Sequence, residues 1–202
     1  MKKISVREIL DLSKETMVVL IGPTAAGKDT LLNELRDMGA TTPVSTTTRP
    51  MRVGEIDGRE YYFLVESAFR EKEFIEKRHI HTAHGIWSYG MSVEEGSKDG
   101  VTILDYDGYL SMSKWRETQG LNTTAVLVDI DKETAKMRYL NRGGDEVEFE
   151  RRWEASVLFF ITSLWASLSF LIWFNSGSIL VTKYINSHIS TTSASPPAPI
   201  AP

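Results

Sequence analysis

The feature that most constrains the fold of this chain is a glycine-rich loop between a short apolar run and a segment of helical character. The run Met17–Ile21 contains no polar residue, which is typical of a strand buried on both faces of a parallel sheet. Residues 22–27 form the loop, and residues 28–38 are predicted to form a helix that ends at Gly39. A strand, a loop and a helix in this order begin a βαβ unit, so the pattern predicts an α/β protein.

The loop has the composition of a phosphate-binding site. Gly22 and Gly27 allow backbone N–H groups to surround an anion, and Lys28 follows where its ammonium group can reach the same oxygen atoms. Asp29 stands where such loops usually have the Ser or Thr that holds Mg²⁺, so we expect Asp29 to bind or orient that ion through water. The residues expected to bind the phosphates of a nucleotide are Gly22, Ala25, Ala26, Gly27, Lys28, Asp29 and Thr30.

Two later apolar runs support the same fold class. Residues 101–104 precede Asp105 and residues 125–128 precede Asp129, and both runs alternate with helix-like segments as βαβ units do. A chain of 202 residues with 42% hydrophobic residues can form one well-packed domain, which we place at residues 1–189. Residues 190–202 contain four prolines and no charge, so we expect a disordered tail rich in Pro, Ser and Ala.

The overall charge argues against some function classes. A formal net charge of -4 does not favour a nucleic-acid-binding surface or binding to an anionic membrane, because both depend on clustered Lys and Arg. The chain has no cysteine, which fits a reducing compartment. Charged residues return too soon after the first apolar ones for a signal peptide, so we expect a cytoplasmic protein.

A second group of anion-binding side chains lies in residues 46–63. Arg49 and Arg52 offer planar guanidinium groups, and Tyr61 adds a hydroxyl donor. Gly54 and Gly58 permit the backbone turns that direct these three side chains to one point. Because the chain then has two phosphate sites, the pattern suggests transfer of a phosphoryl group between them.

The two motifs together resemble the guanylate kinase family of P-loop kinases. The family's GMP-binding segment has the form Thr-Thr-Arg-Pro-x-Arg-x-Gly-Glu-x-Asp-Gly-x-x-Tyr-x-Phe, and residues 47–63 match it at every fixed position. The resemblance covers residues 18–152 well and the rest more loosely. It implies a P-loop NTPase-type parallel sheet flanked by helices, with a GMP-binding insert at about residues 42–95 and a lid at about residues 139–153. It also implies transfer of the γ-phosphoryl group of ATP to GMP, with Mg²⁺ as cofactor.

The resemblance further implies roles for individual residues. The GMP phosphate would be held by Arg49, Arg52, Tyr61 and Tyr89. The guanine base would be read by Ser45, Glu76 and Asp107. Asp105 would lie near Mg²⁺, and Asn175 near the adenine of ATP. Three arginines of the lid region would neutralise the transferred phosphoryl group: Arg138, Arg142 and Arg152.

Departures from the family pattern leave alternatives open. Tyr89 comes thirteen positions after Glu76, a longer spacing than is usual in the family, and Thr82 is an alternative reader of the base. Phosphate loops with Asp in place of Ser or Thr also resemble those of ribose 1,5-bisphosphate kinases, which gives a second candidate function. A non-catalytic guanylate kinase-like binding module is a third, although Gly27 and Lys28 are retained.

Residues 155–182 do not fit the family pattern, because they contain no charged residue. A run of this length can span a bilayer, so a membrane-anchored relic of a kinase, with its anchor at residues 155–174, is a further alternative. Serine and threonine residues interrupt the first part of the run. We therefore expect a buried helix and strand, or a helix buried between subunits of an oligomer.

Overall fold

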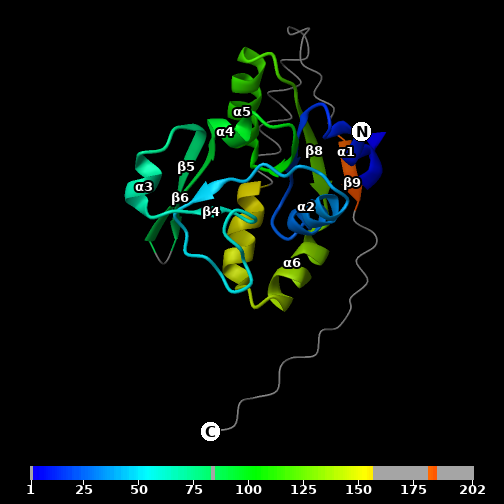
Figure 1. The fold of residues 1–202 in the computed structure, drawn as a ribbon. Helices are drawn as coiled ribbons and strands as arrows, with labels where there is room; N and C mark the ends of the chain where they lie inside the picture. Colours follow the sequence, from blue (N-terminus) through cyan, green and yellow to red (C-terminus); the bar gives the residue numbers. More distant parts are fainter. Residues whose placement is uncertain (1, 83–84, 157–181, 186–202) are drawn as a thin grey trace, which may run out of the picture.

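The computed structural model describes residues 2–82, 85–156 and 182–185. Its centre is a parallel five-stranded sheet, the core sheet, with strand order β1-β9-β8-β2-β7. Figure 1 labels two of its strands, β8 and β9. The strands are β1 (Lys2–Lys3), β2 (Met17–Ile21), β7 (Gly100–Ile103), β8 (Thr123–Asp129) and β9 (Thr182–Ile185). Because β2 lies between β7 and β8, all five of its residues are buried, which explains its uninterrupted apolar sequence. The predicted α/β class with a parallel sheet flanked by helices is confirmed.

Helices cover both faces of the core sheet. On one face, Val18 and Leu20 of β2 pack with α1 (Val6–Leu12) and α2 (Lys28–Asp37). On the other face, Met17, Val19 and Ile21 pack with α5 (Tyr106–Thr118). This alternation follows from the two-residue period of a strand. A further helix, α6 (Lys132–Asn141), follows β8.

Residues 46–92 form a separate four-stranded sheet, the insert sheet, with order β4-β3-β6-β5. Its strands are β3 (Thr46–Thr47), β4 (Tyr62–Phe63), β5 (Phe74–Thr82) and β6 (Gly85–Ser92), with α3 (Glu66–Arg70) between β4 and β5. The long antiparallel hairpin of β5 and β6 has one irregularity in its register, between Phe74 and Glu76. The short helix α4 (Val93–Gly96) leads back to the core sheet.

One buried carboxylate joins the two ends of this inserted region. Glu95 of α4 accepts hydrogen bonds from the backbone N–H of Val44 at 2.9 Å, the hydroxyl of Tyr62 at 3.2 Å and the ammonium of Lys98 at 2.5 Å. Burial alone would raise the pKa of Glu95, but these donors outweigh it and lower the pKa. The carboxylate therefore stays ionised and holds the start of the insert against its end.

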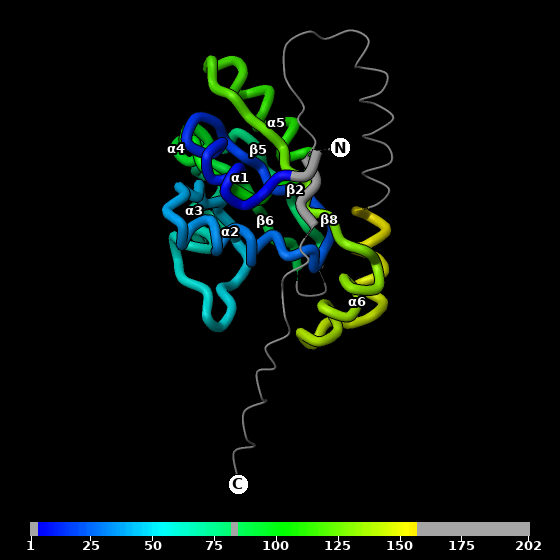
Figure 2. The backbone as a smooth tube through the Cα atoms, turned by 90° about the vertical axis from the view of Figure 1, so that its right-hand side faces the viewer, coloured from blue at the N-terminus to red at the C-terminus, as the bar shows by residue number. Residues whose placement is uncertain are grey.

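A second helix packs on α6. Residues 146–156 are helical, and Phe149 of this segment is fully buried, with its ring centroid 5.6 Å from that of Tyr139. Lys136 of α6 pairs with Glu146 at 2.5 Å and with Glu150 at 3.3 Å. In Figure 2, α6 and the helix at residues 146–156 lie on one side of the core, and the loop between β3 and β4 lies on the other side.

Several predictions concern residues outside the described ranges. Most of the uncharged run at residues 155–182, Asn175 and the tail at residues 190–202 fall there. The backbone of Thr82 is described but its side chain is not. Within the described part of the chain, no helix is both long enough and apolar enough to cross a membrane.

Candidate active site

The glycine-rich loop connects the C-terminal end of β2 to α2, as predicted. The φ angles of Gly22, Ala25 and Gly27 are 154°, 58° and 95°. A Cβ atom at Gly22 would overlap the carbonyl oxygen of Val128 in β8, so glycine is needed for the loop to pass this close to the sheet. Gly27 is the N-cap of α2 and provides no capping side chain. The first N–H groups of α2 are therefore available to an anion.

Lys28 lies folded over this loop. Its Nζ donates hydrogen bonds to the carbonyl oxygens of Gly22 and Pro23, both at 2.8 Å. Burial lowers the pKa of Lys28, Asp29 opposes this effect and Arg142 adds to it. A buried ammonium with a lowered pKa gains stability from a bound polyanion, because the anion offsets the lost hydration. Lys28 is thus placed to bind phosphate oxygens.

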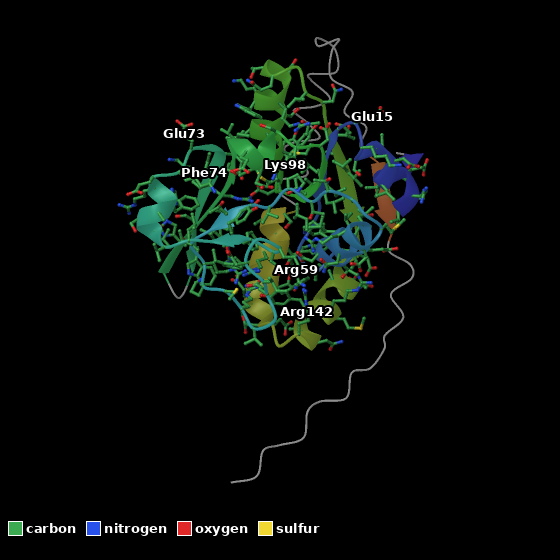
Figure 3. All side chains as sticks on the ribbon, in the orientation of Figure 1. Glu15, Arg59, Glu73, Phe74, Lys98 and Arg142 are labelled. Atoms are coloured by element: carbon green, nitrogen blue, oxygen red, sulfur yellow. The ribbon has the colours of Figure 1, made fainter. Side chains whose placement is uncertain are left out.

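The lid arginines take three different positions. Arg142, the C-cap of α6 (Figure 3), lies close enough to Lys28 for its charge to lower the pKa of that lysine. The Nη1 atom of Arg138 is buried and has no hydrogen-bond partner among the described residues. Arg152 donates from Nε to Glu148 at 2.7 Å and lies 5.9 Å from the ring centroid of Tyr139. In this conformation the charge of Arg142 acts on Lys28, whereas Arg152 is engaged by Glu148 and by the ring of Tyr139 in α6.

Arg49 is the most strongly held of the arginines in residues 46–63. Its side chain is 4% exposed, donates to Glu55 at 2.7 Å and to the carbonyl oxygen of Pro50 at 2.8 Å, and lies 5.5 Å from the ring centroid of Tyr61. Burial would raise the pKa of Glu55, but the hydrogen bonds from Arg49 and from the backbone N–H of Arg52 lower it. Glu55 is a positioning residue that the sequence reasoning did not single out, although it is a fixed position of the GMP-binding motif.

Tyr61 is close to both segments that are expected to bind phosphate. Burial raises its pKa, as does the negative charge of Asp29, while Arg49 and Arg78 lower it. Its ring centroid is 5.8 Å from that of Tyr89 in β6. The start of α2 and the motif in residues 46–63 therefore face one another. Arg52, by contrast, has an exposed side chain in this structure.

Glu76 faces the end of the core sheet. It is 8% exposed, and its Oε2 atom lies 3.6 Å from the position that a Cβ atom would take at Gly108 of α5. Burial raises the pKa of Glu76, against the opposing effects of Arg78 and of the backbone N–H of Met91. Asp105 caps α5 by accepting a hydrogen bond from the N–H of Gly108 at 2.9 Å.

Two further residues expected around the guanine base, Ser45 and Asp107, lie on other segments of the chain. Ser45 is half-buried, and its carbonyl oxygen accepts a hydrogen bond from the N–H of Tyr62 at 2.9 Å. Asp107 is exposed in the first turn of α5. Arg78, which the sequence reasoning did not select, forms an ion pair with Asp105. The sequence gives little indication of this ion pair, because Arg78 and Asp105 lie on segments that are far apart in the chain.

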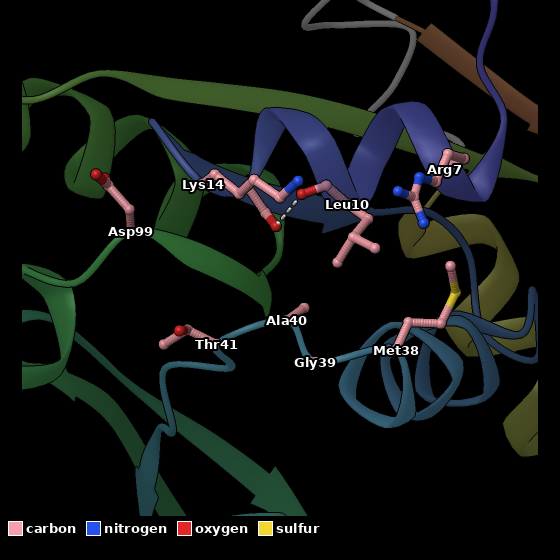
Figure 4. A pocket seen from close by; sticks show the side chains of 9 residues that line it. Arg7, Leu10, Lys14, Met38, Gly39, Ala40, Thr41 and Asp99 are labelled. Carbon is pink, nitrogen blue, oxygen red and sulfur yellow. Dashed lines mark hydrogen bonds between the residues drawn. The ribbon is translucent and has the colours of Figure 1, made fainter.

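A cavity of about 350 Å³ lies away from these residues (Figure 4). It is lined by Arg7 and Lys14 on the α1 side, by Met38 and Thr41 after α2, and by Asp99. Both cations pair with Asp11, at 3.8 and 2.7 Å. The cavity is at the C-terminal end of α2, whereas the phosphate loop is at its N-terminal end, about 15 Å away for ten helical residues.

Comparisons with known proteins show which family the chain is similar to. The family model for guanylate kinase matches residues 14–156. The chain is 51% identical over 57 residues to a guanylate kinase of Gloeobacter violaceus, a match covering 27% of this chain and 28% of that protein. It is 35% identical over 149 residues to a guanylate kinase of Bifidobacterium longum, covering 67% of this chain and 74% of that protein. The solved guanylate kinase of Anaplasma phagocytophilum has a TM-score of 0.47 and 18% identity, covering 86% and 77% of the two chains. The chain belongs to the guanylate kinase family.

Proposed function

We propose that this protein is a guanylate kinase that transfers the γ-phosphoryl group of ATP to GMP and releases ADP and GDP. The observation that supports this most directly is the position of Tyr61. Its pKa responds to Asp29 at the donor side and to Arg49 at the acceptor side. A donor loop and an acceptor motif that lie on either side of one tyrosine can bring two phosphate groups into line.

The donor side would bind ATP through charge and backbone N–H groups. Lys28 and the start of α2 would hold the β- and γ-phosphates, and Thr30 would donate to the α-phosphate. Arg142 and Arg152 of the lid at about residues 139–153, together with Arg138 just before it, would neutralise the charge that develops on the transferred oxygens. Arg152 would have to leave Glu148 for this contact.

Magnesium is proposed as the cofactor, because this ion binds through one or two carboxylates together with phosphate oxygens. Asp29 fits that role, since it is exposed and adjacent to Lys28 at the loop. Asp105 would be a second carboxylate, although Arg78 and the N–H of Gly108 engage it here. When bound, the ion would supply positive charge to the phosphates.

The acceptor side, at about residues 42–95, would bind GMP. Arg49, Arg52, Tyr61 and Tyr89 would hold its phosphate. Glu76 and Asp107, with Ser45, would read the guanine. The ion pair of the buried Arg49 with Glu55 favours this assignment, because a guanidinium that is already oriented loses little entropy on binding a phosphate.

The test is a coupled assay of ADP release with GMP, AMP, UMP and ribose 1,5-bisphosphate as separate acceptors. We expect GMP to give the highest kcat/KM. A preference for ribose 1,5-bisphosphate would contradict the proposal and favour the second kinase activity. Binding of GMP without any ADP release would instead indicate a non-catalytic binding module.

A further inference from the structure

Arg78 connects the insert sheet to the core sheet. It lies on β5, and its guanidinium forms an ion pair with Oδ2 of Asp105, the residue that caps α5 at the end of β7. The other carboxylate oxygen of Asp105, Oδ1, accepts the N–H of Gly108. One aspartate therefore serves both as the cap of a core helix and as the partner of an insert-sheet arginine.

Arg78 also lies among the residues expected to bind the acceptor. Arg78 and Glu76 are two positions apart on β5, beyond the register irregularity, so both side chains project to the same side of the sheet. Arg78 is directly opposite Tyr89 on β6, which brings their side chains within contact range. The charge of Arg78 lowers the pKa of both Glu76 and Tyr61, which also indicates close approach.

The guanidinium of Arg78 has donors to spare. Its Nε atom is buried, yet has no hydrogen-bond partner in the described part of the chain, and the side chain as a whole is 31% exposed. A buried donor without an acceptor is unfavourable, and a guanidinium with one edge free can still bind a phosphate. Arg49, by comparison, already donates to Glu55 and Pro50.

We propose that Arg78 is a further acceptor-binding residue, which donates to the phosphate of the bound nucleoside monophosphate and which Asp105 holds in position when no nucleotide is bound. The proposal rests on the function proposed above. The alternative is a purely structural ion pair, in which Arg78 would only attach the insert sheet to α5.

Calorimetric titration with GMP, without ATP or Mg²⁺, separates these two roles. We expect Arg78→Ala to weaken GMP binding about tenfold, the effect of losing one charged hydrogen bond, and Arg78→Lys to give an intermediate loss. Asp105→Asn should bind GMP at least as tightly as the unchanged protein, because it removes a competing anion while Asn still caps α5. The double variant should bind as weakly as Arg78→Ala. Lys77→Ala is the matched control, since Lys77 is an exposed cation on the same strand and should leave the affinity unchanged.

Two results would overturn the inference. Arg78→Ala with unchanged GMP affinity would show that the guanidinium does not reach the acceptor. Equal losses in Arg78→Ala and Asp105→Asn would show that the ion pair only supports the fold. Thermal melting of each variant shows whether a loss of GMP affinity comes from unfolding. If Arg78→Ala does not fold, Arg78→Lys, which keeps the charge, is compared with the unchanged protein in its place. Failure of the unchanged protein to bind GMP would refute the proposed function itself, which is a distinct outcome.

Discussion

At the scale of single residues, the proposed acceptor side depends on a carboxylate that orients an arginine. Glu55 holds Arg49 with one oxygen and the backbone N–H of Arg52 with the other, at 2.7 Å each. Without this partner, the guanidinium of Arg49 would be buried and unpaired, which is costly. The motif thus supplies both the proposed phosphate-binding group and its support within a few residues.

We expect Glu55→Gln to raise the KM for GMP severalfold and to lower the free energy of unfolding by about 1–3 kcal/mol, because a charged hydrogen bond in a buried place is lost. Steady-state kinetics and urea unfolding measure the two effects. The control is Glu73→Gln, whose side chain points away from the protein (Figure 3). An unchanged KM would mean that Arg49 does not need Glu55 to bind GMP.

Lys28 belongs to the donor side alone, since its hydrogen bonds stay within the phosphate loop. Lys28→Ala should therefore abolish phosphoryl transfer and leave the affinity for GMP nearly unchanged. The coupled assay and a GMP titration of the same preparation measure both quantities. A parallel loss of GMP affinity would be incompatible with two separate phosphate sites.

At the scale of elements, the hairpin of β5 and β6 explains the long spacing between Glu76 and Tyr89. The register pairs Tyr89 with Arg78, and the strands continue past this pair to Thr82 and Gly85. The added residues therefore lengthen the hairpin and leave Glu76 and Tyr89 in the same sheet, at the candidate site. The same register places an arginine between the expected base reader and the expected phosphate ligands.

The helix at residues 146–156 is held by ion pairs that titrate in acid. Hydrogen bonds from Arg151 and then Arg152 lower the pKa of Glu148 from 4.5 to about 2. A carboxylate whose pKa is lower in the folded than in the unfolded protein stabilises the folded protein at pH values above its pKa in the unfolded state. This stabilisation disappears as the pH falls through its pKa in the folded state.

The difference in melting temperature between the protein and Glu148→Gln should therefore be constant above about pH 5 and vanish toward pH 2. Its size will be modest, because the pair is near the surface. Circular dichroism melting curves at several pH values and at low salt measure it. A difference that persists at pH 2 would show that Glu148 acts through packing and not through its charge.

At the scale of the whole molecule, the two sheets are joined by buried polar groups as well as by packing. The fully buried Arg116 of α5 donates to the carbonyl oxygens of Gly96 at 2.7 Å, Lys98 at 3.0 Å and Asn122 at 3.0 Å. It also pairs with Asp99. It thereby fixes the segment that leads from the insert sheet back to β7.

Arg116→Met should destabilise the protein by about 3 kcal/mol or more, because three carbonyl oxygens and Asp99 lose their donor and Gly96 is a buried residue. Urea unfolding monitored by tryptophan fluorescence gives the change. Lys114→Met, at an exposed position of the same helix, is the control and should change stability by less than about 0.5 kcal/mol. Equal effects of the two substitutions would contradict this role for Arg116.

The sequence by itself determined the features that depend on neighbouring residues. The buried strand Met17–Ile21, the loop after it and the helix beginning at Lys28 were predicted because strand burial, glycine geometry and helix boundaries are local properties. The segment containing Arg49 and Tyr61 could be identified for the same reason. Its residues reach one another through turns at Gly54 and Gly58, where φ is 87° and 77°.

Only the tertiary structure decided which distant segments meet. The ion pair of Arg78 with Asp105 depends on the register of a long hairpin and on how the insert sheet rests against α5. The approach of Arg142 to Lys28 likewise depends on how α6 follows β8 in the core sheet. Such contacts arise from the summed packing of many apolar residues, and no short stretch of sequence encodes that packing.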